Sequence, residues 1–165
     1  MGTTLATNDV GSRFTVPSFT ITITNASGHP YSLDEDAFWD FRHLQSIVLP
    51  EGLTSIGENA FVSCSELSKV TIPKSVLTIG IYAFADCLEL KEVVFLSKTP
   101  PDFTGYSHFR NQHSDCVFRV PNASYVSVLN NMGIALERII VPERKVMKIK
   151  EINIKQGKVE IKPRK

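Results

Sequence analysis

Residues 44–64 read LQSIVLPEGLTSIGENAFVSC, and this stretch decides the fold because its pattern returns 23 residues later. Residues 67–87 read LSKVTIPKSVLTIGIYAFADC, with apolar residues, Pro, Gly, Ala-Phe and Cys at matching positions. A third copy begins at Leu90, and a partial copy precedes the first, with Leu33 one period before Ile56. A fixed period of this length is typical of solenoids, in which each repeat forms one coil of a stack.

The positions within one repeat have physical reasons. Ile47 and Leu49 fall on one side of an extended strand, and Pro50 ends that strand because it cannot donate to a ladder. The apolar residues that follow return to the interior, and Gly57 permits a sharp turn that a side chain would obstruct. Residues 58–64 are expected to form a single short helical turn that places Ala-Phe in the core.

Stacking should arrange like residues into ladders. One coil cannot bury its apolar edge alone, and neighbouring strands lie about 4.8 Å apart. An odd number of cysteines, with parallel side chains in the ladder, favours buried free thiols over disulfides. The expected ladders are Phe38, Phe61 and Phe84, and Cys64 and Cys87.

The pattern LxxIxLPxxLxxIGxxAFxxC resembles the BspA-like leucine-rich repeats of surface proteins from anaerobic bacteria and some mucosal protozoa. The resemblance extends to KTPP at 98–101, Phe109, VFRVP at 117–121 and Tyr125, which are similar to the segment that closes such arrays. It implies a non-enzymatic interaction module, extracellular or at the cell surface, that binds host protein or glycan. The alternative is a purely structural spacer in a larger envelope protein.

These patterns predict a mostly β solenoid of the α+β class. A short leucine-rich-repeat stack of about two full and two partial coils should lie between an N-terminal capping strand and a C-terminal cap. Residues 19–24 alternate as a strand, and 122–134 should form a short helix with Val126 and Leu129 inward. The expected boundaries are a flexible N-terminus at 1–13, an N-terminal cap at 14–36, repeats at 37–98, a C-terminal capping repeat at 99–143, and a basic terminal strand, hairpin or linker at 144–165.

Charge is divided unevenly along the chain. Residues 144–165 carry nine Lys/Arg and two Glu, whereas residues 1–143 carry nine basic and fifteen acidic residues. The tail lysines could neutralise phosphates, yet no aromatic residues lie among them to stack on bases, so nucleic acid is not an expected partner. The sequence also has no apolar run long enough to span a bilayer, and no signal-peptide core is visible in residues 1–13.

Catalytic and metal-binding chemistry is sparse. His108, His113, Asp115 and Cys116 form the one cluster with metal-ligand chemistry, but their spacing matches no standard pattern. The polar, irregular segment 102–114 is instead expected to be a solvated loop. The sequence contains no nucleophile elbow and no glycine-rich phosphate loop. It therefore predicts no catalytic residues, no metal site and no cofactor.

The outward strand positions remain as candidates for recognition, because the core explains most of the recurring residues. Lys69 and Glu92 should be direct cross-strand neighbours and are expected to pair. Exposed apolar and aromatic side chains on a rigid face are typical of interface hot spots. The candidate binding residues are Ser46, Val48, Lys69, Thr71, Glu92, Val94 and Trp39.

Overall fold

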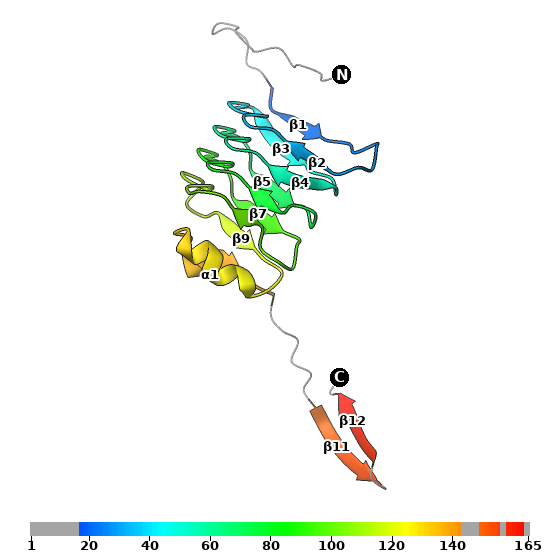
Figure 1. Ribbon diagram of the computed structural model, residues 1–165. Helices are drawn as coiled ribbons and strands as arrows, with labels where there is room; N and C mark the ends of the chain where they lie inside the picture. The colour runs from blue at the N-terminus through cyan, green and yellow to red at the C-terminus, as the bar shows by residue number, and fades with distance from the viewer. Residues whose placement is uncertain (1–16, 143–148, 156–157, 164–165) are drawn as a thin grey trace, which may run out of the picture.

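The chain winds into a solenoid in which successive coils add strands to a main parallel sheet (Figure 1). The structure, a computed structural model, describes residues 17–142, 149–155 and 158–163. The main sheet has the strand order β1-β3-β5-β7-β9-β10, which confirms the predicted solenoid class. Its strands are β1 (Phe19–Thr22), β3 (Leu44–Val48), β5 (Lys69–Ile72), β7 (Glu92–Phe95), β9 (Val117–Arg119) and β10 (Ile139–Ile140).

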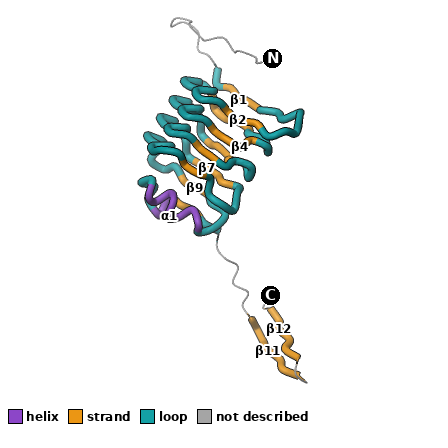
Figure 2. The backbone as a smooth tube through the Cα atoms, in the orientation of Figure 1, coloured by secondary structure: helices purple, strands orange, loops and turns teal. Residues whose placement is uncertain are grey.

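A second, four-stranded parallel sheet forms another side of the coils, which the sequence did not predict (Figure 2). The apolar residues after each proline return to the interior as expected, but they also pair from coil to coil. With six strands in the main sheet, the stack is longer than the expected two full and two partial coils. The second sheet contains β2 (Tyr31–Leu33), β4 (Leu53–Ile56), β6 (Thr78–Ile79) and β8 (Asp102–Phe103).

The 23-residue period sets the strand register. Lys69 pairs with Glu92 and Val70 with Val93, so alternate side chains face the core at matching heights. Val70 and Val93 are buried, as are the leucines that begin each copy. The hydrophobic core therefore runs continuously along the axis of the stack.

The expected helical turn at residues 58–64 is wrong. The segment is a series of turns, and the Phe61 amide donates to the Ala83 carbonyl of the next coil at 2.8 Å and not along a helix. Two left-handed residues, four apart, interrupt the helical path in each coil. Asp and Asn tolerate this conformation better than most residues. These residues are Asp36 and Asp40, Asn59 and Ser63, Tyr82 and Asp86, and Ser107 and Asn111.

Gly57 and Gly80 are needed for close approach between coils. Neither has a positive φ. A Cβ on Gly80 would lie 2.6 Å from the Glu58 amide nitrogen, and a Cβ on Gly57 would lie 2.6 Å from the Asp34 carbonyl carbon. The backbone of each coil thus packs directly against the preceding coil at this position.

The aromatic ladder is four rings long. Phe38 and Phe61 stack with ring centroids 5.2 Å apart, Phe61 and Phe84 are 5.0 Å apart, and Phe84 and Phe109 are 5.5 Å apart. Phe109 follows Phe84 by 25 residues, because this coil is two residues longer than the repeat. The longer spacing is the reason that the sequence did not place Phe109 in the ladder.

All three cysteines are buried free thiols. Cys64 donates from Sγ to the Phe38 carbonyl, and Cys87 donates to the Phe61 carbonyl, both at 3.2 Å. Burial raises the pKa of Cys64 to about 12 and that of Cys116 to about 11. Such thiols are poor nucleophiles and metal ligands, because only the thiolate has either reactivity.

The segment 102–114 is a coil of the stack and not the expected solvated loop. It contributes β8 to the second sheet and buries His108 and Phe109. Cys116 comes directly before β9 and takes the ladder position that Leu90 holds in the preceding coil. The Cys116 amide donates to the His113 carbonyl, as the Leu90 amide donates to the Cys87 carbonyl.

A short helix covers the last coil. Helix α1 (Ser124–Asn131) lies within the predicted range and buries Leu129, and the half-buried Val126 packs against the core as predicted. Tyr125, which the sequence placed in the closing segment but not in the core, is fully buried and donates its hydroxyl to the Ser97 carbonyl at 2.9 Å. A 3-10 turn (Leu136–Arg138) leads into β10.

Beyond the solenoid, β11 (Ile149–Lys155) and β12 (Lys158–Pro163) pair in an antiparallel arrangement. The expected flexible stretch at 1–13 lies outside the described residues, as do the side chains of the basic tail. In the described part of the chain, no helix is both long and apolar enough to cross a membrane.

Candidate functional site

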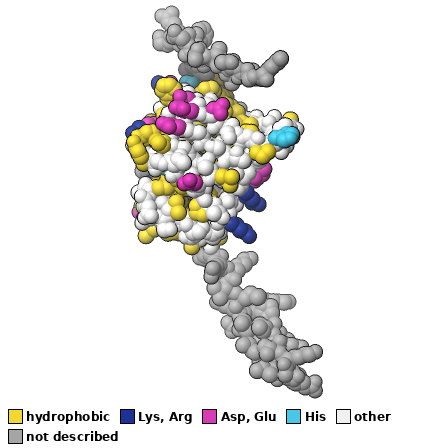
Figure 3. Space-filling model, viewed as in Figure 1, with side chains coloured by type: hydrophobic (Ala, Val, Ile, Leu, Met, Phe, Trp, Pro, Cys, Tyr) yellow, Lys and Arg dark blue, Asp and Glu magenta, His cyan; other side chains and the backbone are white. Residues whose placement is uncertain are grey.

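Six of the seven candidate binding residues lie on neighbouring strands of the main sheet, on its outward face. Ser46 pairs with Lys69, which pairs with Glu92. Two positions further along each strand, Thr71 pairs with Val94, and the same register places Val48 beside Thr71. Figure 3 shows hydrophobic side chains scattered over the visible surface of the molecule between polar and charged groups.

Lys69, Glu92 and Arg119 form an ion-pair ladder on three adjacent strands. Lys69 Nζ and Arg119 Nε each lie 2.5 Å from a different carboxylate oxygen of Glu92. The hydrogen bonds from Lys69 and then Arg119 lower the pKa of Glu92. Two cations surround one carboxylate, so the ladder has a net positive charge. Sequence reasoning missed Arg119, because the two-residue insertion hides the pairing of β9 with β7, in which Arg119 lies opposite Val94 and diagonal to Glu92.

Trp39 lies apart from these residues. It is 59% exposed in the turn between Asp36 and Asp40, whereas the other candidates lie on main-sheet strands. The structure therefore does not bring Trp39 into the candidate binding face.

The histidine and cysteine cluster does not converge. His108 is 1% exposed and Cys116 is buried in the leucine ladder. His113 Nδ1 accepts the backbone amide of Asp115 at 3.1 Å and lies 4.0 Å from the Asp115 carboxylate. In residues 17–142, no group of three or more His, Cys, Asp or Glu side chains could hold a metal ion.

Ser18, Glu66 and His43 have the composition of a catalytic triad but not its order. Ser18 donates to one oxygen of Glu66 at 2.6 Å, and the Nδ1 atom of His43 lies 2.9 Å from the other oxygen. In a triad the histidine must contact the serine in order to take its proton. Here the carboxylate separates them, so this cluster joins the first strands to the next coil.

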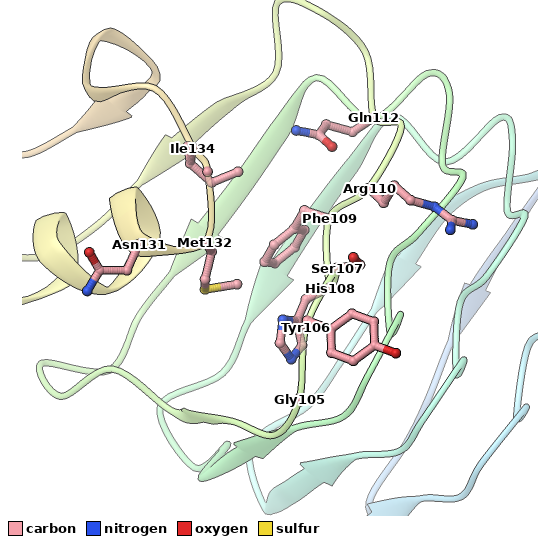
Figure 4. Close-up of a pocket in the computed structure, with 11 residues that line it drawn as sticks. Gly105, Tyr106, Ser107, His108, Phe109, Arg110, Gln112, Asn131, Met132 and Ile134 are labelled. Carbon is pink, nitrogen blue, oxygen red and sulfur yellow. The ribbon is translucent and has the colours of Figure 1, made fainter.

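A groove lies between the turn in the coil that contains residues 102–114, which we call the last long coil, and the segment that follows helix α1 (Figure 4). Its volume is about 400 Å³. His108 lines one wall, and Met132 and Ile134 line the other. The Nε2 atom of His108 is 3.0 Å from the Thr104 carbonyl oxygen, whereas Nδ1 is buried without a hydrogen-bond partner among the described residues.

His108 occupies the position that Ala60 and Ala83 hold in the preceding coils. Its carbonyl accepts the Phe84 amide, as that of Ala83 accepts the Phe61 amide. Burial lowers the pKa of the His108 imidazole, so the ring is neutral near pH 7. Sequence reasoning missed this groove, because the coil that has histidine in place of alanine is also the coil with two additional residues, and the 23-residue offset does not align the two positions.

Comparison with known protein families agrees with the repeat. A family model described as a BspA type leucine rich repeat region matches residues 15–123 in six copies, which is more than half of the chain. No curated protein matches the chain.

Proposed function

The chain belongs to the BspA-type leucine-rich-repeat family, and from this membership we propose that it is a non-enzymatic module that binds a host protein or glycan. A repeat array of this family is an interaction or structural module. The family is associated with bacterial surface proteins, which supports a location at the cell surface or outside the cell.

The outward face of the main sheet is the binding surface of this proposal. One observation carries it: the ion-pair ladder of Lys69, Glu92 and Arg119 lies next to the half-exposed Val94 on a rigid sheet. Ordering such a face costs little entropy on binding, because the backbone is already fixed. Its net positive charge favours a partner that presents a carboxylate or another acidic group.

The same ladder also supports the second candidate function, a rigid spacer. Lys69 and Arg119 are already paired with Glu92, so their charges are satisfied within the chain. A stack whose outward charges pair with one another needs no partner to be stable. Binding experiments separate these two functions.

We expect replacement of Lys69 with alanine, combined with Val94→Ser, to weaken binding about thirtyfold or more, since central interface side chains contribute roughly 1–2 kcal/mol each. The measurement is surface plasmon resonance against immobilised extracellular-matrix proteins and a glycan array. Leu77→Ala is a matched control, because Leu77 is 65% exposed and lies outside the main-sheet strands.

Two results contradict the proposal. Equal binding by the double variant and the unmodified chain would remove the main-sheet face from the interaction. Failure of the unmodified chain to bind any member of either panel would favour the spacer.

A further inference from the structure

We propose that the groove between the last long coil and helix α1 is a sugar-binding site, in which His108 accepts a hydrogen bond from a hydroxyl of a neutral sugar. The site is separate from the main-sheet face, and the proposal does not depend on the function proposed for that face. It rests on the steric position of His108, on its tautomer and on the chemistry of the groove walls.

The position of His108 places a buried imidazole at the wall of the groove, where its ring also packs edge-on against Phe103 at 5.2 Å. Ala60 and Ala83 are fully buried at this position, where another coil stacks directly on them. The coil that carries His108 is followed by helix α1 and the turn after it, which leave a groove (Figure 4). An imidazole fits there because no further turn of the same kind packs against it.

The tautomer of His108 follows from its one hydrogen bond. The Thr104 carbonyl can only accept, so Nε2 carries the ring proton and donates it at 3.0 Å. In a neutral imidazole the other nitrogen is then a lone-pair acceptor. Nδ1 is buried and unpaired in the part of the chain that the structure describes, and an unsatisfied buried acceptor costs about 1–3 kcal/mol. A ligand that donates to Nδ1 recovers this cost.

The walls of the groove favour a neutral ligand. Arg110 points away from the groove in Figure 4 and binds Asp86 at 2.9 Å. Gln112 supplies an amide that can donate and accept, and Met132 and Ile134 form an apolar wall. A pyranose ring offers hydroxyls to the imidazole and the amide, and presents its C–H face to the apolar wall. The volume of about 400 Å³ falls within the range of small-molecule sites.

The test is nitrogen-15 NMR of the full chain labelled at histidine. Long-range proton–nitrogen spectra report the tautomer, and titration reports binding. The probes are glucose, galactose, mannose and N-acetylglucosamine, with their β-linked disaccharides. We expect an Nε2–H tautomer for His108 and a saturable shift of its Nδ1 resonance with at least one probe, while the exposed His29 does not shift.

Two variants test the contacts. His108→Gln keeps an amide donor for the Thr104 carbonyl but takes the acceptor away from the Nδ1 position, so it should fold and bind the sugar more weakly. Gln112→Leu leaves His108 in place, so its Nδ1 resonance still reports the titration, and affinity should fall about fivefold to tenfold for the lost hydrogen bonds. Gln45→Leu makes the same substitution at an exposed position of β3 and should leave the affinity unchanged.

Four outcomes would overturn the proposal. They are a proton on Nδ1 in the free protein, no saturable shift with any of the sugars, unchanged affinity in Gln112→Leu, and an equal response to N-methylacetamide. The last result would assign the groove to a peptide group and not to a sugar.

Discussion

Phe84→Ala is expected to lower the free energy of unfolding by about 3–5 kcal/mol, the usual cost of deleting a fully buried phenylalanine ring. Phe84 is 0% exposed and lies between Phe61 and Phe109, with both neighbouring rings within 5° of parallel to it. The neighbouring coils cannot collapse into the gap, because the Phe84 amide donates to His108 and the Phe61 amide to Ala83. Denaturant unfolding followed by circular dichroism measures the change.

Trp39→Ala is the matched control for this prediction. It also deletes a large aromatic side chain, but Trp39 is 59% exposed, so the free energy of unfolding should change by less than about 1 kcal/mol. Equal losses for Trp39→Ala and Phe84→Ala would show that Phe84 is not part of a continuous buried stack.

Gly80→Ala is expected to destabilise the chain by about 3 kcal/mol through a backbone clash. The new Cβ would lie 2.6 Å from the Glu58 amide nitrogen and 2.7 Å from the Gly57 carbonyl carbon. Both are backbone atoms held by inter-coil pairing, so no side-chain rotation relieves the contact. Where an alanine fits, the same substitution stabilises proteins by about 0.4–1 kcal/mol, so the sign of the effect is diagnostic. Thermal and denaturant unfolding measure it.

Gly28→Ala separates the clash from the general cost of replacing a glycine. Gly28 has a φ of +67° and nothing within 4 Å of its added Cβ, so only the left-handed backbone opposes alanine. That strain costs about 1–2 kcal/mol. A neutral or stabilising Gly80→Ala would contradict the close approach between coils.

The repeated half of the structure was predictable from the sequence. In the copies at 44–64 and 67–87, the apolar positions that form the core recur at one offset, and stacking converts that offset directly into strand register. The second sheet was less visible, because β6 and β8 contain two residues each and strands this short have no alternating pattern to detect.

The end of the stack could not be predicted in the same way. Two additional residues in the coil before Phe109 break the 23-residue offset, so Phe109, His108 and Arg119 no longer align with Phe84, Ala83 and the β7 strand. The neighbours of Arg119 follow only from the three-dimensional pairing of β9 with β7, and those of His108 and Phe109 from the contacts of their turn with the preceding coil. The groove was the hardest feature to predict, because it is formed by the coil whose length departs from the 23-residue repeat.

The most direct test of the continuous stack is hydrogen exchange of the Phe84 amide. Phe38, Phe61 and Phe84 each donate this proton to the next coil at 2.8 Å, and the acceptor of Phe84 is His108. If the stack extends through residues 102–114, the Phe84 amide should exchange as slowly as the Phe61 amide, because both then exchange only when the stack unfolds almost completely. Exchange of Phe84 at the rate of an unfolded chain, with Phe61 still protected, would show that the last long coil does not stack.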